Sequence, residues 1–178
     1  MRTRRATIWP IDHVLFLCTG NAARSVMAGA ALAARLPDIT VETAGTLTLD
    51  GQPMSWRTRA ALTAFGLEAA RHRSRQVSLI DLDRATLIIG LAPEHVQWVR
   101  RNHHRVAART ATLKRLCRDL PSDGRHLAER VAVLSLDAVE LEPWEEVVDP
   151  GGGDADVFLE CAGEVVDLVD RLALVLQS

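Results

Sequence analysis

One stretch near the start of the chain limits the possible folds more than any other. Residues 14–17 form an unbroken apolar run, which is typical of a strand buried on both faces, as in a parallel sheet covered by helices. The run ends at Cys18, and Gly20 and Asn21 follow, which are residue types that tolerate positive φ. From Arg24 onward the sequence is rich in Met, Ala and Leu, which favours a helix. We therefore predict a strand, a tight loop and a helix in succession.

A loop between a strand and a helix can bind an anion, because its N–H groups converge and the helix N-terminus adds partial positive charge. Cys18 and Arg24 lie in this loop in the pattern Cys-x5-Arg-Ser. A helix N-terminus and an arginine both favour the thiolate form of a cysteine. The guanidinium can bind two oxygens of a phosphoryl group. A thiolate beneath a bound phosphate is placed for in-line displacement, so the motif indicates cysteine-dependent phosphate chemistry.

A simpler interpretation of the motif is a buried cysteine at a strand end with an incidental arginine. The chain is rich in arginine, and yet Cys117 and Cys161 have aspartates, Asp123 and Asp167, at the position that Arg24 occupies after Cys18. The apolar run before the motif, the serine after the arginine and the helical sequence beyond it favour a phosphate-binding loop.

Cys18-Thr19-Gly20-Asn21-Ala22-Ala23-Arg24-Ser25, together with Asp149-Pro150 near the C-terminus, resembles the low-molecular-weight protein tyrosine phosphatase family. Larger tyrosine phosphatases place the acidic aspartate before the cysteine, and this family places it far after. Residues 43–46, 72 and 75–77 also resemble the family pattern, so the resemblance covers about residues 12–117 and 147–176. It implies an α/β three-layer sandwich: a four-stranded parallel sheet of order 2-1-3-4 with helices on both faces.

The resemblance also implies roles for single residues. Cys18 would be the nucleophile, Arg24 would bind phosphate, and Asp149 would be the general acid and then the general base. The phosphate-binding residues would be Thr19, Gly20, Asn21, Ala22, Ala23, Arg24 and Ser25, and loop support would come from Asn21, Ser25, Thr43 and His72. The Ser25 hydroxyl would stabilise the Cys18 thiolate. Other readings remain open: Ser25 as a helix cap, His72 as a solvated side chain, and Asp149 as part of an Asp-Pro turn.

The sequence departs from the family at two places. Ala23 stands where family members commonly carry a second cysteine, so oxidised Cys18 would have no partner within the loop. Relatives line the cleft with tyrosines after Asp-Pro, whereas glycines follow here and the chain has no tyrosine. Replacement walls could come from Trp56, Trp144, Leu47 or Leu49, although core packing is the favoured interpretation of each.

The remaining chemistry-bearing residues give no sign of a metal site. His103 and His104 are adjacent, so on a helix their side chains point about 100° apart and cannot chelate one ion together. The acidic pairs at positions 145–146 and 154–156 are interpreted as solvated charges. We expect no metal and no cofactor.

Composition narrows the class of protein. A chain of 178 residues predicts one domain, which we place at residues 12–178 as a single phosphatase-like domain after a flexible tail of residues 1–11. The net charge of −2 gives no reason to expect nucleic acid or membrane as a partner. Three cysteines at irregular spacing indicate a reducing compartment, so we expect a cytoplasmic protein. Asp12 precedes Cys18 by a strand length of about 20 Å, too far for a shared site, and Trp9 is interpreted as packing.

Periodicity predicts the remaining elements. Strands are expected at residues 39–42, 85–91 and 106–113, and helices at residues 55–65, 93–102 and 156–176. Residues 127–136 fit either a helix or a strand. In the helix at residues 55–65, the side chains available to the core are Trp56, Ala60, Leu62 and Ala64. We also expect Trp98, Cys117 and Cys161 to be buried.

The predicted activity is metal-free hydrolysis of phosphomonoesters, by resemblance phosphotyrosine on proteins, through a phosphocysteine on Cys18. One alternative is arsenate reductase of the same fold, but its second pair of cysteines follows the third strand and residues 91–110 contain none. Another is a phosphate- or phosphotyrosine-binding regulatory module with weak or lost turnover. The altered walls favour this second alternative, and the presence of Cys18, Arg24 and Asp149 opposes it.

Overall fold

A parallel β-sheet forms the centre of the computed structural model, which describes residues 12–178. Its strands are β1 (His13–Cys18), β2 (Thr40–Gly45), β3 (Leu87–Gly90) and β4 (Thr110–Thr112), in the order β2-β1-β3-β4. The β1–β2 register pairs Cys18 with Gly45, and the β1–β3 register pairs Leu17 with Gly90. The carboxyl ends of β1, β2 and β3 therefore meet at one edge. This confirms the predicted sheet and its strand order.

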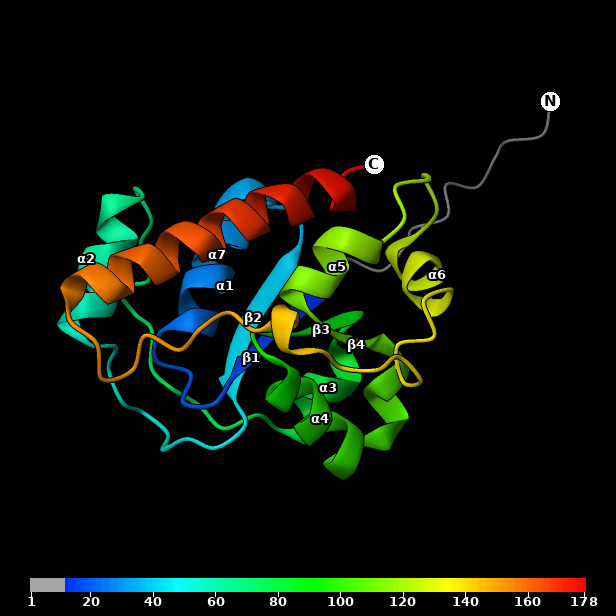
Figure 1. Cartoon of the computed structure of the whole chain (residues 1–178), viewed down its shortest axis with the longest axis horizontal. Helices are drawn as coiled ribbons and strands as arrows, with labels where there is room; N and C mark the ends of the chain where they lie inside the picture. The colour runs from blue at the N-terminus through cyan, green and yellow to red at the C-terminus, as the bar shows by residue number, and fades with distance from the viewer. Residues whose placement is uncertain (1–11) are drawn as a thin grey trace.

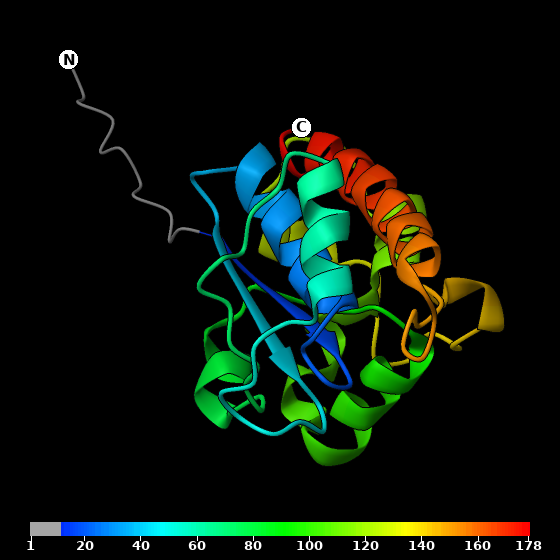
Figure 2. The same ribbon diagram turned by 90° about the vertical axis from the view of Figure 1, so that its left-hand side faces the viewer.

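Helices cover both faces of the sheet (Figures 1 and 2). One face carries α1, α2, α5 and α7, with α7 lying across the other three, and the opposite face carries α3 and α4. The bounds are α1 (Arg24–Arg35), α2 (Trp56–Ala64), α3 (Leu79–Arg84), α4 (Pro93–Asn102), α5 (Leu113–Asp119), α6 (Leu127–Ala132) and α7 (Ala155–Leu176). Two 3-10 helices, η1 (His104–Arg109) and η2 (Pro143–Glu145), complete the fold.

Alternation along β1 explains why this strand is the centre of the fold. Val14 and Phe16 pack with α1 and α7, whereas Leu15 and Leu17 pack with the helices of the opposite face. All four side chains are fully buried. Burial on both faces is what an unbroken apolar run in a parallel sheet requires.

Several predicted elements differ in extent. The second strand runs to Gly45 instead of residue 42, and the third is only Leu87–Gly90. The strand expected at residues 106–113 is confined to Thr110–Thr112, because the preceding residues form η1 and the following ones begin α5. Residues 127–136, for which the sequence fitted either a helix or a strand, begin with the helix α6. The helices α3 and α5 were not predicted; they are short, and their start is marked by capping side chains of Ser78 and Thr112.

The predicted core face of α2 was correct for Leu62 and wrong for its other three residues. Trp56, Ala60 and Ala64 are exposed, and the buried residues of this helix are Thr58, Ala61 and Leu62. The hydroxyl of Thr58 has a partner in the interior, which allows a polar side chain on that face. Cys161 is buried as expected, whereas Cys117 and Trp98 are only half-buried.

Of the residues discussed near the N-terminus, the structure describes Asp12 but not Trp9. Residues 1–11, including Trp9, lie outside the described residues. Asp12 lies at the start of β1, where its carbonyl accepts a hydrogen bond from the Thr40 N–H, and its side chain is near Arg130. Cys18 is at the opposite end of the same strand. Within residues 12–178, no helix combines the length and apolar character needed to cross a bilayer.

Candidate active site

The loop between β1 and α1, here called the Cys18 loop (residues 18–25), is held from outside by hydrogen bonds to its carbonyl oxygens. The Cys18 and Thr19 carbonyls accept from the main-chain N–H groups of Thr46 and Leu47. The following three carbonyls accept from side chains: Gly20 from Thr48 Oγ1 at 2.7 Å, Asn21 from His72 Nε2 at 2.8 Å, and Ala22 from Thr58 Oγ1 at 3.0 Å.

This outward bonding determines where the N–H groups of the loop point. In a trans peptide the N–H is directed opposite to the preceding carbonyl, and the described chain has no cis peptide bond. Carbonyls bonded outward therefore turn the N–H groups of residues 19–23 toward the inside of the loop. Ala23, the residue before α1, offers no capping side chain, so the helix N-terminus adds its own N–H groups. The result is a concave set of donors suited to an oxyanion.

Asn21 holds the turn of this loop. Its φ is +49°, in the left-handed region that asparagine tolerates better than most residues, and its side chain is fully buried. The carboxamide donates to Ser25 Oγ at 3.0 Å and Thr43 Oγ1 at 2.9 Å, and its oxygen accepts from the Arg75 N–H at 3.0 Å. Asn21 thus joins the Cys18 loop to β2 and to the segment before α3.

Ser25 lies between Asn21 and the cysteine. Its Oγ is 2.9 Å from Cys18 Sγ and already accepts a hydrogen bond from Asn21 Nδ2. The hydroxyl proton is therefore free to point at the sulfur, which is the arrangement that stabilises a thiolate. Ser25 is the second residue of α1 and does not cap it, so the alternative interpretation of Ser25 as a helix cap was wrong.

His72 is a structural partner of the loop and is not a freely solvated side chain, because its ring donates to the Asn21 carbonyl. Burial lowers the pKa of His72, and the charges of Arg73 and Arg75 lower it further, against the effect of the Asn21 hydrogen bond. A neutral ring protonated at Nε2 satisfies this geometry.

Asp149 reaches the Cys18 loop through Arg24. The Arg24 guanidinium is buried, and it donates from Nη1 to the Val147 carbonyl at 3.1 Å and from Nη2 to Asp149 Oδ2 at 2.7 Å. The other carboxylate oxygen accepts the Gly151 N–H at 2.9 Å. Cys18, Arg24 and Asp149 line one pocket of about 190 Å³, together with Gly20, Ala22, Ala23, Ser55, Thr58, Gly151 and Phe158.

The walls of this pocket differ from those considered from the sequence. Core packing was the wrong interpretation of Leu47, Leu49 and Trp56, whose side chains are 78%, 75% and 65% exposed. Leu47 and Leu49 belong to the segment that bonds the Cys18 loop, and Trp56 follows Ser55 of the pocket wall. Trp144 is also exposed, but it lies over Arg118 on α5 and lines a different cavity.

Sequence reasoning missed Phe158 and His95. Phe158 is the aromatic residue of the pocket wall, and its place on the first turn of α7 gave no signal beyond helical periodicity. His95, on α4, is almost completely buried, with Nε2 3.1 Å from Thr19 Oγ1. Burial lowers the pKa of His95 to about 3, and the Arg24 charge acts in the same direction. His95 therefore supports the Cys18 loop as a neutral ring.

Acidic and histidine side chains of the described residues do not gather into a metal site. No group of three or more His, Cys, Asp or Glu residues with suitable geometry occurs in residues 12–178. Two acidic pairs, at positions 145–146 and 154–156, are interpreted from the sequence as solvated charges, and the structure gives them different environments. Asp154 caps α7, accepting the Asp156 and Val157 N–H groups. The prediction for Glu145 was wrong, because this carboxylate is fully buried against Arg115.

Comparison with known proteins agrees with this geometry. The family model for low molecular weight phosphotyrosine protein phosphatase matches residues 13–129. A protein-arginine-phosphatase of Geobacillus stearothermophilus is 30% identical over 93% of this chain and 97% of its own length. A probable low molecular weight protein-tyrosine-phosphatase, EpsP, of Ralstonia nicotianae is 31% identical over 60% of this chain and 71% of its own.

A solved structure of the YwlE arginine phosphatase from Geobacillus stearothermophilus superposes with a TM-score of 0.76, at 30% identity and covering 93% of each chain. The arrangement of Cys18, Arg24 and Ser25 on one strand–loop–helix unit is thus found together with a match of sequence and of fold. This chain belongs to the low molecular weight phosphotyrosine protein phosphatase family.

Proposed function

We propose that this protein removes phosphate from phosphorylated protein side chains through a phosphocysteine intermediate on Cys18. The observation that carries the proposal is that the carbonyl groups of residues 18–22 are all bonded outside the Cys18 loop, which leaves its N–H groups to face inward, with Cys18, Arg24 and Asp149 lining the same pocket. Such a donor set stabilises the equatorial oxygens of a transferring phosphoryl group.

In the first step, Cys18 Sγ attacks phosphorus and the bond from phosphorus to the leaving atom breaks. Protonated Asp149 gives its proton to the leaving atom, which departs as a neutral group. In the second step, water attacks the phosphocysteine, and the Asp149 carboxylate takes a proton from it. The P–S bond breaks, inorganic phosphate leaves, and the Ser25 hydroxyl stabilises the thiolate that is released.

Arg24 can bind both Asp149 and phosphate in this scheme. Its guanidinium uses one N–H of Nη1 for the Val147 carbonyl and one of Nη2 for Asp149. An arginine has five N–H donors in a fixed fork, so further donors remain for phosphate oxygens. Phosphate can therefore bind beside Asp149 without breaking the hydrogen bond from Arg24 Nη2 to Asp149 Oδ2. The same guanidinium would hold the acid and the phosphoryl group in one fixed geometry.

The substrate side chain has two candidates. Phosphotyrosine is supported by the family and by the names of the Ralstonia relatives. Phosphoarginine is the second candidate, because the relative that aligns over nearly the whole chain is named a protein-arginine-phosphatase. The chain has no tyrosine, and the aromatic residue of the described pocket wall is Phe158. This wall favours neither substrate side chain over the other.

Two measurements test the proposal. Wild-type protein should hydrolyse para-nitrophenyl phosphate, Cys18→Ser should reduce hydrolysis to background, and Asp149→Asn should slow it about 10²- to 10⁴-fold. Matched peptides carrying phosphotyrosine or phosphoarginine, compared by kcat/KM, then identify the preferred side chain. Phosphate binding by the wild-type protein without turnover of any of these substrates would refute the proposal in favour of a binding module.

A further inference from the structure

The segment that carries Asp149 has little regular structure of its own. We call residues 142–149 the Asp149 segment; apart from η2 it is an extended loop. Its later part is fixed next to the active site, because the Val147 N–H donates to the Leu91 carbonyl at 2.8 Å and the Val147 carbonyl accepts from Arg24. Its earlier part is fixed by side chains that the proposed chemistry does not use.

Glu145 holds the earlier part from the inside. Its carboxylate is fully buried and accepts hydrogen bonds from Thr112 Oγ1 at 2.5 Å, Arg115 Nε at 3.0 Å and the Glu142 N–H at 2.9 Å. A further bond comes from Arg115 Nη2. Burial acts to raise the pKa of Glu145, but the bonds from Arg115 and Thr112 outweigh it and leave the pKa lowered. Glu145 is therefore a carboxylate when folded, with its buried charge fully partnered.

Arg115 ties this carboxylate to α5 and to more of the loop. It also donates from Nη2 to the Glu140 carbonyl at 2.8 Å, and the Trp144 ring lies 5.4 Å from its guanidinium carbon. The hydrogen bond to Glu145 is the largest of the effects that raise the pKa of Arg115. A buried ion pair is a weak source of stability compared with apolar residues of the same volume. What such a pair does provide is a fixed direction and distance.

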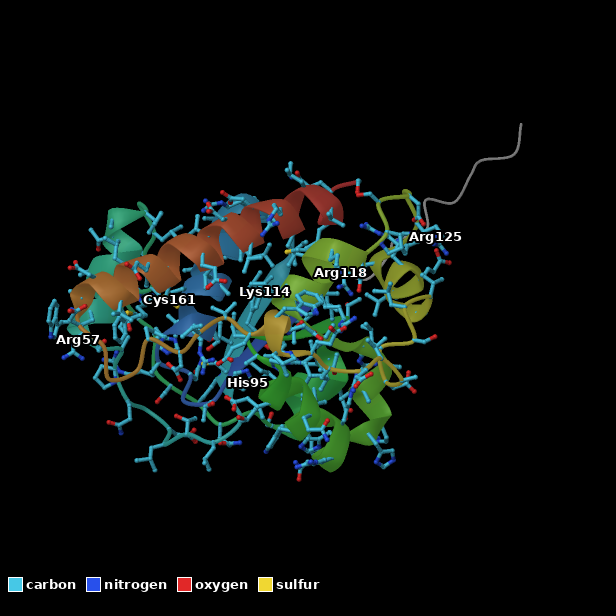
Figure 3. The ribbon with its side chains drawn as sticks, in the orientation of Figure 1. Arg57, His95, Lys114, Arg118, Arg125 and Cys161 are labelled. Carbon is cyan, nitrogen blue, oxygen red and sulfur yellow. The ribbon has the colours of Figure 1, made fainter. Side chains whose placement is uncertain are left out.

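Lys114 holds the same segment from the outside. Its Nζ donates to the Glu146 carbonyl at 2.5 Å and pairs with Glu164 Oε1 of α7 at 2.6 Å. Figure 3 shows Lys114 and Arg118 along α5, beneath α7. Consecutive residues of α5, Lys114 and Arg115, thus bind consecutive residues of the Asp149 segment, Glu146 and Glu145.

We propose that Arg115, Glu145 and Lys114 are positioning residues, which set the distance from the Asp149 carboxyl to the leaving group. This rests on the proposed role of Asp149 as general acid. The contacts lie within a few residues of Asp149, where a shift of about 1 Å can cost about 100-fold in rate. They touch neither the phosphate nor the sulfur, so their loss should affect proton donation and leave phosphate binding in place.

Dependence on the leaving group distinguishes positioning from general stabilisation. Phenyl phosphate needs a proton on its leaving oxygen, whereas 2,4-dinitrophenyl phosphate leaves readily without one. We expect Arg115→Met and Glu145→Gln to lower kcat/KM for phenyl phosphate by about tenfold or more, per folded molecule. For 2,4-dinitrophenyl phosphate, kcat/KM should stay within about twofold of wild type, and so should inhibition by inorganic phosphate.

A matched control is Arg130→Met. Arg130 is equally buried and donates to the carbonyls of Pro121, Val175 and Ser178, at the end of α7 far from Asp149. This variant should be destabilised without a selective loss on phenyl phosphate. Lys114→Met removes a partly exposed side chain, so it remains testable if the buried variants do not fold, and it should show the same selectivity to a smaller degree.

Equal losses on both substrates in the Arg115, Glu145 or Lys114 variants that fold, or no loss in them, would overturn the proposal. Asp149→Asn, measured with the same two substrates, separates this failure from failure of the proposed function. If Asp149→Asn itself shows no selective loss on phenyl phosphate, the general-acid role of Asp149 is wrong. If Asp149→Asn shows the selective loss and the positioning variants do not, only the positioning proposal is wrong.

Discussion

Arg24 Nη2 donates to Asp149 Oδ2 at 2.7 Å, which joins two residues 125 positions apart in the chain. The guanidinium is buried, whereas the Asp149 carboxylate is 55% exposed. The ion pair therefore spans the boundary between the floor of the pocket and solvent. The same guanidinium also binds the Val147 carbonyl, two residues before Asp149. Arg24 therefore has two roles: it sets the position of Asp149, and it lines the pocket proposed to bind phosphate.

This double use predicts that Arg24→Lys is not a conservative change. Lysine keeps the charge but has no planar fork, so it cannot bind Val147, Asp149 and phosphate at the same time. We expect kcat/KM for para-nitrophenyl phosphate to fall by about 100-fold or more, with weaker inhibition by inorganic phosphate. The matched control is Arg35→Lys. Arg35 lies at the far end of α1 from Arg24, and its Nε pairs with Asp170 Oδ1 of α7 at 2.6 Å. A wild-type rate for Arg24→Lys would contradict the role given to the fork.

Asn21 supports a prediction that separates backbone strain from hydrogen bonding. Asn21→Ala places an alanine at φ +49° and removes the bonds to Ser25, Thr43 and the Arg75 N–H, whereas Asn21→Gly removes the bonds alone. Each bond contributes about 1 kcal/mol, and the left-handed conformation costs alanine about 1 kcal/mol more than glycine. Urea unfolding should therefore rank the free energy of unfolding as wild type, then Asn21→Gly, then Asn21→Ala.

Activity gives the second readout at Asn21. Both variants leave Ser25 Oγ without its donor, so its hydroxyl is no longer restricted to pointing at Cys18. We expect kcat to fall in both variants, and by similar amounts. Equal stability of the two variants, or a wild-type kcat in either, would contradict this account of the Cys18 loop.

The Cys18 loop could be predicted from sequence because its determinants are local. An apolar run, a glycine and an asparagine, and a helix-forming stretch follow one another directly, and each limits the backbone by itself. Asn21 at φ +49° is the residue type that such a turn requires. The sheet order came from the family resemblance, and the structure has the same order.

The surroundings of the loop were not predictable in the same way, because they depend on contacts distant in sequence. Thr58 can lie on the buried face of α2 because its hydroxyl donates a hydrogen bond to the Ala22 carbonyl. Glu145 read as a solvated charge, since nothing near it in sequence shows that Arg115 and Thr112 will surround it. A charged residue can be assigned to the interior only when its partner is known.

The buried ring of His95 predicts a specific pH dependence of stability. Unfolded histidine takes up a proton below about pH 6.5, whereas burial lowers the pKa of folded His95 to about 3. The unfolded state then binds more protons between these values, so the free energy of unfolding falls as the pH falls through this range. The contribution of His95 is about 2 kcal/mol between pH 7 and pH 5.

The measurement compares urea unfolding of wild type and His95→Gln at pH 7 and pH 5. His72, whose pKa is also lowered, contributes in both proteins and cancels in the comparison. His95→Gln should lose less stability on acidification than wild type does. His104→Gln, at an exposed histidine, is the control for the substitution itself. Identical slopes for wild type and His95→Gln would show that His95 takes up its proton in the folded state.

The cysteines should differ sharply in reactivity toward alkylation. Burial raises the pKa of Cys117 to about 11 and that of Cys161 to about 12, so less than about one in a thousand of either is thiolate at pH 7.5. Cys18 lines the active-site pocket beside Ser25. Iodoacetate should therefore label Cys18 alone. The fraction of activity lost should equal the fraction of Cys18 labelled, and inorganic phosphate should slow both. Mass spectrometry locates the label, and Cys117→Ser/Cys161→Ser should be inactivated at the wild-type rate. Inactivation that tracks labelling of Cys161 would contradict this assignment.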